Sequence, residues 1–211
     1  MSNHNLDQRI RGCLLGAAIG AELALARIVH PERFTLADPQ HIDQLELAPA
    51  GEYRLTPNRT WYAKARPLID LGVRAYLEKG GRITPEEFGE MFKTDAGIAE
   101  PSFAFDALHS VQELLKEGMH ARLSGMLAAP SGLIAGAMPA VGIFHFADPE
   151  RAYLDGVELA SVAQDRLGAD WAALSAAAVA AALDRGATEE KVIETVLKLA
   201  HHNNKEVFYS L

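Results

Sequence analysis

Three glycines recur at every fourth position near the N-terminus, in an apolar stretch that contains no proline. Gly12, Gly16 and Gly20 would line one face of a helix, where each glycine costs about 1 kcal/mol relative to alanine. A face without side chains lets another group approach the helix backbone closely. That group is either a tightly crossing helix or a ligand or metal ion, so the face is a candidate binding surface.

Cysteine and histidine chemistry is not supported by the sequence. Cys13 is the one cysteine, and its apolar neighbours would raise the pKa of its thiol, which argues against a cysteine nucleophile. The histidines at His109, His120 and His145 are widely spaced. No short ligand spacing links them to one another or to a cysteine, so no zinc site is predicted.

The elements that would position these residues are helices, because few stretches alternate between apolar and polar residues as strands do. Thr84-Pro85-Glu86-Glu87 is typical of a helix start, as are Asp148-Pro149 and Thr188, while Gly80-Gly81 is typical of a helix end. The residues after Gly118 are predicted as a loop. The first helix is expected to be buried, and the alanine-rich helix is expected to pack closely between its neighbours. The predicted helices cover 6–28, 60–79, 84–92, 103–117 and 171–184, with further helices starting at 149 and 189.

Composition and charge limit the possible functions. The 211 residues are 49% hydrophobic, which favours one compact domain. A net charge of −8 argues against nucleic acid and membrane partners, and a phosphate ligand would need a local site. No segment has the roughly 18 consecutive apolar residues of a membrane-spanning helix. The single cysteine fits the cytoplasm. Arg9 and Arg11 before the apolar run have the outline of a signal peptide, although Asp7 and Glu22 argue against one.

The stretch RIRGCLLGAAIG, from Arg9 to Gly20, resembles the opening motif of the ADP-ribosylglycohydrolase family. Members of that family continue with an aspartate, whereas Ala21 and Glu22 follow here. The acidic residue is thus one position later than in the family. On a helix this shift turns its side chain by about 100° around the helix axis. The resemblance implies a carboxylate that assists a water molecule, and Glu22 is the best visible candidate for this catalytic role. Gly20 is a candidate substrate-binding residue. A paired or rim carboxylate is the alternative for Glu22.

The second match is TPNRT, from Thr56 to Thr60, where the family has Thr-Asp-Asp-Thr for a pair of magnesium ions. Thr60 fits the motif, but Asn58 and Arg59 replace the two aspartates. The resemblance implies magnesium as cofactor, yet the acidic ligands are not matched, and no metal ligand is assigned. Arg59 could instead bind a phosphate or carboxylate with both arms of its guanidinium, or be an ordinary exposed arginine. Asn58, Arg59 and Thr60 are candidate substrate-binding residues.

The third match is the region 148–183, which resembles the later helices of the family in order and spacing. Before it, Ser131 and Gly132 lie where the family has a glycine-rich turn, and their backbone N–H groups are candidate ligand contacts. Close helix packing is the alternative explanation for the glycines. Members of the family also carry an Asp-x-Asp-Thr stretch near their C-terminus, and this chain ends without one.

The resemblance implies an all-α fold, a compact multi-helix orthogonal bundle of the ADP-ribosylglycohydrolase type. We expect a single domain over 1–211 that lacks the family's C-terminal part. The function it implies is hydrolysis of an N- or O-glycosidic bond in a small-molecule ADP-ribosyl or related ribosyl substrate. A non-catalytic homologue with a binding or structural role is the alternative. A generic helical interaction domain is a third possibility, which an exposed apolar patch would indicate.

Overall fold

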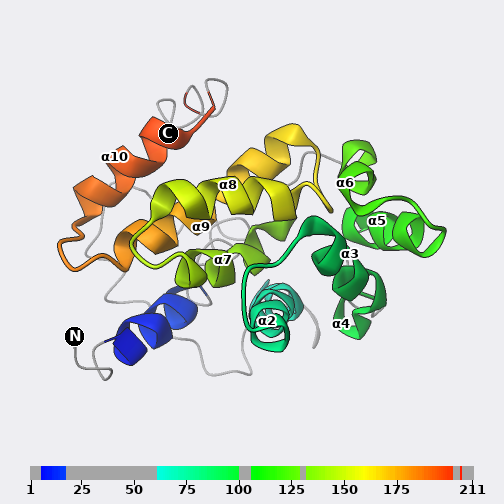
Figure 1. Cartoon of the computed structure of the whole chain (residues 1–211), viewed down its shortest axis with the longest axis horizontal. Helices are drawn as coiled ribbons and strands as arrows, with labels where there is room; N and C mark the ends of the chain where they lie inside the picture. Colours follow the sequence, from blue (N-terminus) through cyan, green and yellow to red (C-terminus); the bar gives the residue numbers. More distant parts are fainter. Residues whose placement is uncertain (1–5, 18–60, 100–105, 129–131, 202–204, 206–211) are drawn as a thin grey trace, which may run out of the picture.

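The computed structural model describes residues 6–17, 61–99, 106–128, 132–201 and 205. Within these ranges the regular elements are helices and no strand occurs, which confirms the predicted all-α fold. After an N-terminal helix at 6–17, the elements are α2 (Trp61–Lys79), α3 (Pro85–Thr94), α4 (Ala96–Ala99), α5 (Asp106–Lys116), α6 (Ala121–Ser124), η3 (Gly125–Leu127), η4 (Leu133–Ala137), α7 (Met138–Phe144), α8 (Pro149–Ala160), α9 (Arg166–Ala182) and α10 (Glu189–Leu199). Figure 1 shows α7, α8 and α9 at the centre, with α10 on one side and α3 to α6 on the other.

Side chains at the helix ends explain where several helices begin. The Thr84 hydroxyl accepts a hydrogen bond from the Glu87 backbone N–H, and the Glu87 carboxylate accepts one from the Thr84 N–H at 3.0 Å. This is the predicted capping box of α3. Asp148 and Thr188 cap α8 and α10, as predicted. Gly80, with φ of 66°, follows α2 in the left-handed conformation that commonly ends a helix, which confirms the predicted stop.

The N-terminal helix at 6–17 differs from the buried helix that the sequence predicts. Its residues are half-buried or exposed, and Leu15 is 62% exposed. A Cβ added to Gly12 or Gly16 would contact no atom within 4 Å. The predicted close approach to the glycine face is therefore wrong at these two positions, because the glycines leave open space there. Arg9 connects this helix to the end of α9 by donating a hydrogen bond to the Leu183 carbonyl oxygen at 2.8 Å.

Helix α9 forms the centre of the hydrophobic core. A Cβ on Gly156 of α8 would lie 3.0 Å from the Ala173 Cα, and a Cβ on Gly142 of α7 would lie 2.5 Å from the Ala176 carbonyl oxygen. Small residues on all three helices therefore let their backbones approach closely. This confirms the predicted tight packing of the alanine-rich segment, although α9 begins earlier than predicted, at Arg166. The fully buried alanines of α9 are Ala172, Ala173, Ala176, Ala177 and Ala180.

The region between Gly118 and Asp148 is largely helical in its described part, although the sequence predicts a loop. It contains α6, η3, η4 and α7, of which the longest has 7 residues. Such short helices show no apolar repeat, and their stability comes from packing rather than from local sequence. The contact of η4 with α2 is an example, because a Cβ on Gly72 would lie 2.3 Å from the Ala137 carbonyl oxygen.

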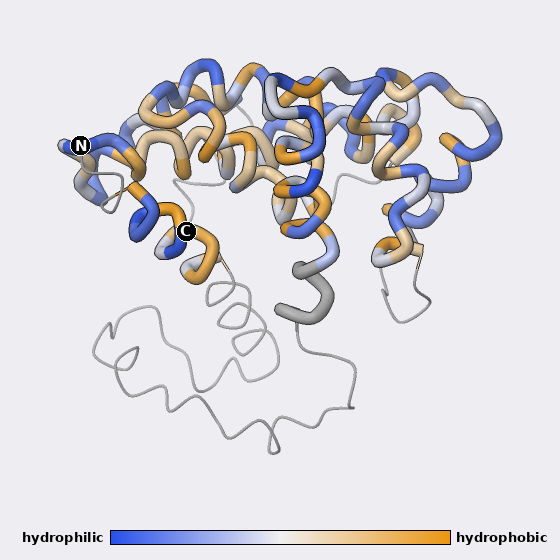
Figure 2. The backbone as a smooth tube through the Cα atoms, turned by 60° about the horizontal axis from the view of Figure 1, so that its bottom comes forward, coloured by the Kyte–Doolittle hydropathy of each residue, from blue (hydrophilic) through white to orange (hydrophobic). Residues whose placement is uncertain are grey.

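Most helices have one apolar and one polar face. Hydrophilic and hydrophobic stretches alternate along the helices in Figure 2, as expected where one face contacts the core and the other contacts solvent. In α5, for example, Leu108 and Val111 are buried while Glu113 is exposed. Among the described helices, none combines the length and the apolar character needed to cross a membrane.

Candidate functional site

The residues that the sequence predicts for the site lie mostly outside the described part of the chain. Gly132 lies inside it, so its backbone and neighbours can be described directly. The predicted helix after Thr60 is confirmed as well, because α2 begins at Trp61. The remaining candidates stay predictions, since they lie outside the described residues: Gly20, Glu22, Asn58, Arg59, Thr60 and Ser131.

Gly132 forms a tight turn immediately before η4. Its φ of 64° is left-handed, a conformation that glycine adopts without strain. Its carbonyl oxygen accepts a hydrogen bond from the Ala135 N–H at 3.0 Å, which closes the first turn of η4. A Cβ at this position would lie 3.7 Å from the Trp171 Cβ of α9. The turn therefore lies against the first half of α9, and its conformation favours glycine.

The Gly132 turn is held by Gln164, which precedes α9 and is 1% exposed. The Gln164 side-chain oxygen Oε1 accepts a hydrogen bond from the Gly132 N–H at 2.7 Å, and its Nε2 donates one to the Ala163 carbonyl oxygen at 2.9 Å. The Gly132 N–H is therefore bonded to Gln164 in this structure, rather than open to the ligand that the sequence predicts for it. The role of Gln164 is not predictable from the sequence, because no local pattern marks a contact between residues 32 positions apart.

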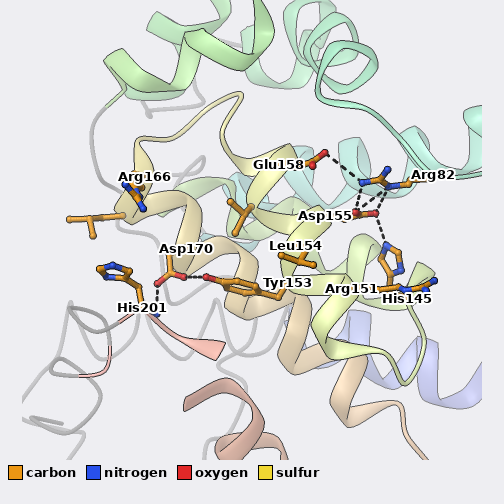
Figure 3. Close-up of a pocket in the computed structure, with 12 residues that line it drawn as sticks. Arg82, His145, Arg151, Tyr153, Leu154, Asp155, Glu158, Arg166, Asp170 and His201 are labelled. Atoms are coloured by element: carbon orange, nitrogen blue, oxygen red, sulfur yellow. Dashed lines mark hydrogen bonds and ion pairs between the residues drawn. The ribbon is translucent and has the colours of Figure 1, made fainter. Parts of the chain in front are cut away.

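A pocket of about 990 Å³ lies along α8, on a different part of the surface from the Gly132 turn. Helix α8 and the first turn of α9 line it, together with Arg82 before α3, His145 after α7 and His201 after α10. Figure 3 shows its polar side chains in two groups, one around Asp155 and one around Asp170. Gly132 does not line this pocket. The apolar part of the lining comes from Leu154, Val157 and Leu167.

The first group is an ion-pair network centred on Asp155, which is 7% exposed. Arg82 donates to both oxygens of this carboxylate, from Nη2 to Oδ1 at 2.7 Å and from Nε to Oδ2 at 2.9 Å and to Oδ1 at 3.1 Å. His145 Nε2 lies 2.7 Å from Asp155 Oδ2, and Glu158 lies 3.6 Å from Arg82. The network, drawn in Figure 3, joins Arg82 to α8 and to the end of α7, more than 60 residues further along the chain. The sequence does not indicate this carboxylate partner of His145, whose spacing from the other histidines predicts no zinc site either.

The surroundings shift the pKa values in this network. Burial by itself would raise the pKa of Asp155, but the hydrogen bonds from Arg82 and His145 outweigh burial and hold that pKa below its usual range. The hydrogen bond with Asp155 raises the pKa of Arg82. Burial, reinforced by the Asp155 charge, raises the pKa of Tyr76. At neutral pH the network thus has an ionised carboxylate beside a charged guanidinium, which suits a structural ion pair better than a general base.

The second group connects α8, α9 and the end of α10. Asp170 of α9 accepts a hydrogen bond from the Tyr153 hydroxyl of α8 and another from the His201 backbone N–H at 3.3 Å. Burial and the hydrogen bond with Asp170 raise the pKa of Tyr153. Asp170 is 6% exposed, so it is a buried carboxylate with hydrogen-bond partners. The hydrogen bonds of Asp170 with Tyr153 and with the His201 backbone connect the segments that form this part of the pocket wall.

The donor groups at 56–60 and those of the described residues do not fit the pair of magnesium ions that the resemblance implies. In the ranges that the structure describes, no group of three or more His, Cys, Asp and Glu residues could hold a metal ion. At 56–60 the sequence offers a neutral oxygen from Asn58 next to the cation of Arg59. Two hard divalent cations need anionic oxygen ligands, so no catalytic step is assigned to a metal.

Comparison with known protein families confirms the resemblance found in the sequence. The family model described as ADP-ribosylglycohydrolase matches residues 2–209. This range includes the glycine series, the motif at 56–60 and the turn at Gly132. No curated protein and no solved structure matches the chain.

Proposed function

Since the chain belongs to the ADP-ribosylglycohydrolase family, we propose that it hydrolyses an N- or O-glycosidic bond of an ADP-ribosyl or related ribosyl substrate. The observation that carries this proposal is the family match over residues 2–209, which spans every segment in which sequence analysis found a candidate site residue. The substrate is a small molecule or a modified side chain. The enzyme would act as a single helical domain in the cytoplasm.

The proposed roles use groups of this chain alone. Glu22 assists the attacking water as general base, and Arg59 binds a phosphate oxygen pair of the substrate with its guanidinium. Asn58 and Thr60 bind polar groups of the substrate. The backbones of Gly20, Ser131 and Gly132 allow the substrate to approach. The tight turn at Gly132 agrees with the glycine-rich turn that the family has at this place.

The test is hydrolysis of peptides that carry ADP-ribose on arginine, an N-glycosidic bond, or on serine, an O-glycosidic bond. Free ADP-ribose is measured by mass spectrometry, with magnesium present or removed by a chelator. We expect release from at least one peptide in both conditions. Glu22→Gln is expected to lower kcat about a hundredfold, the usual size of a general-base contribution. The matched control is Glu189→Gln, which removes an exposed carboxylate in the first turn of α10.

The outcome also decides between two functions. Pro57-Asn58-Arg59 in place of the acidic motif favours a second candidate, a homologue that binds ADP-ribose without cleaving it. Binding by isothermal titration without release of ADP-ribose from either peptide would support that candidate. No binding and no release, with or without magnesium, would contradict both.

A further inference from the structure

The pocket along α8 has the size of a small-molecule site and carries arginines at both of its ends. Its volume of about 990 Å³ is close to the upper end of the usual range, roughly 300–1,000 Å³. Figure 3 shows Arg166 and His201 at one end, Arg82 and Arg151 at the other, and Leu154 between them. The pocket therefore offers an apolar stretch next to charged groups.

Two buried carboxylates hold the wall of this pocket in place. Asp155 binds the side chains of Arg82 and His145. Asp170 accepts hydrogen bonds from the Tyr153 hydroxyl and from the backbone that follows α10. These contacts lie within the protein, so the wall is formed before any ligand binds. A wall that is already formed loses little conformational freedom on binding, which favours affinity.

The apolar part of the lining is open to solvent. Leu154 of α8 is 58% exposed, and Leu167 in the first turn of α9 is 39% exposed. Single exposed leucines are common on protein surfaces, but these two line the same pocket, together with the half-buried Val157. Covering their side chains would remove apolar surface from water, which is favourable. The lining therefore suits a ligand with an apolar body.

Arg166 gives one end of the pocket a positive charge that no carboxylate of the described chain pairs with. Its side chain is exposed and makes no ion pair or hydrogen bond with another described residue. It occupies the first position of α9, where the positive end of the helix dipole disfavours a cation. Arg82, by contrast, is bound by Asp155, and Asp170 is 6% exposed and already hydrogen-bonded. An anionic group of a ligand would therefore bind at Arg166.

We propose that this pocket binds a small amphipathic anion, whose carboxylate pairs with Arg166 and whose apolar body covers Leu154 and Leu167. A guanidinium donates two parallel hydrogen bonds to a carboxylate, which fixes one end of the ligand. The net charge of −8 repels anions from the chain as a whole, so the affinity comes from this local site. This binding does not depend on the proposed hydrolysis, because the residues that carry it lie in α8 and α9.

The test is titration of the full chain with octanoate, followed by NMR of the leucine methyl groups. We expect octanoate to shift the methyl signals of Leu154 and Leu167. Octanamide has the same apolar chain without the charge and should bind about fivefold more weakly or worse. Inorganic phosphate has charge without the apolar chain and should leave these signals unchanged. Added NaCl should weaken octanoate binding, because salt screens an exposed ion pair.

Two variants with matched controls separate the charge from the apolar contact. Arg166→Gln and Leu154→Gln should each raise the Kd for octanoate about fivefold. The controls are Arg185→Gln and Leu77→Gln, because Arg185 and Leu77 are also exposed and neither lines the pocket. Both controls should keep the wild-type Kd. All four side chains are exposed, so circular dichroism should show the wild-type fold in every variant.

Three results would overturn the proposal. One is the absence of octanoate-induced shifts at Leu154 and Leu167, or equal shifts with phosphate, which would remove the role of the apolar body. The second is equal affinity for octanoate and octanamide, which would remove the role of the charge. The third is a wild-type Kd in Arg166→Gln, or an equal loss of affinity in Arg185→Gln. Failure to release ADP-ribose from either peptide would contradict the proposed hydrolysis and leave octanoate binding unchanged.

Discussion

Replacing Gly125 with alanine is expected to lower the free energy of unfolding by a large part of its total, roughly 4 kcal/mol or more. A Cβ at this position would lie 2.0 Å from the Ser161 carbonyl oxygen and 2.4 Å from the Gln164 carbonyl oxygen. Both atoms belong to the backbone between α8 and α9, so they have no side-chain rotation with which to avoid the methyl group. Overlap of this kind costs roughly 4 kcal/mol or more, against a total stability of about 5–15 kcal/mol.

The measurement is urea unfolding followed by circular dichroism. Gly81→Ala is the matched control, because a Cβ at Gly81 would contact no atom within 4 Å. We expect the free energy of unfolding of this control to stay within about 1 kcal/mol of the wild-type value. An equally small change in Gly125→Ala would show that η3 and the turn before α9 are not in such close contact.

Glycine spacing was a poor guide to close packing in this chain, and the reason is physical. The regular series drew attention to Gly12 and Gly16, yet both face open space. Close approaches to backbone atoms occur instead at other glycines, for example Gly72, Gly125 and Gly142, which belong to no repeat. A repeat shows which residues share a helix face. Whether another backbone reaches that face depends on tertiary packing, and residue spacing does not reveal tertiary packing.

Helix starts were predictable because they depend on residues next to one another. A threonine or aspartate that caps a helix contacts an N–H group three residues later, so Thr84, Asp148 and Thr188 could be recognised from sequence. The short helices from α6 to α7 have no such side-chain cap at most of their starts. The Gly132 cap of η4, for example, makes no side-chain hydrogen bond, and its N–H partner comes from Gln164.

The candidate site was predictable from the sequence only in part. The Gly132 turn was found from its place in a family motif, and the structure places a tight turn there. Its partner Gln164 is 32 residues away, and the partners Arg82 and Asp155 are 73 residues apart. Contacts over these separations follow from how α7, α8 and α9 pack together. A single sequence without that packing does not indicate them.

The contact between Arg82 and Asp155 leads to the second large expected effect. Asp155→Asn should lower the free energy of unfolding by about 2–3 kcal/mol, because the variant loses the charge that Arg82 and His145 bind inside the protein. This is below the loss typical of a fully buried ion pair, since the Arg82 side chain is 59% exposed. Urea unfolding at pH 7 measures the difference. Glu86→Gln, at the exposed pair with Arg122, should have a much smaller effect.

The pH dependence of the Asp155→Asn effect tests its electrostatic origin. The pKa of Asp155 is lower in the folded state than in the unfolded chain, so its stabilising contribution is complete above the ordinary carboxyl pKa of about 4. The contribution is lost as the pH falls through the folded-state pKa, where Asp155 takes up a proton and its pairing with Arg82 weakens. The difference between wild type and Asp155→Asn should therefore narrow below about pH 4. A difference that stays constant down to pH 3 would mean that the aspartate stabilises the fold through shape and neutral hydrogen bonds rather than through its charge.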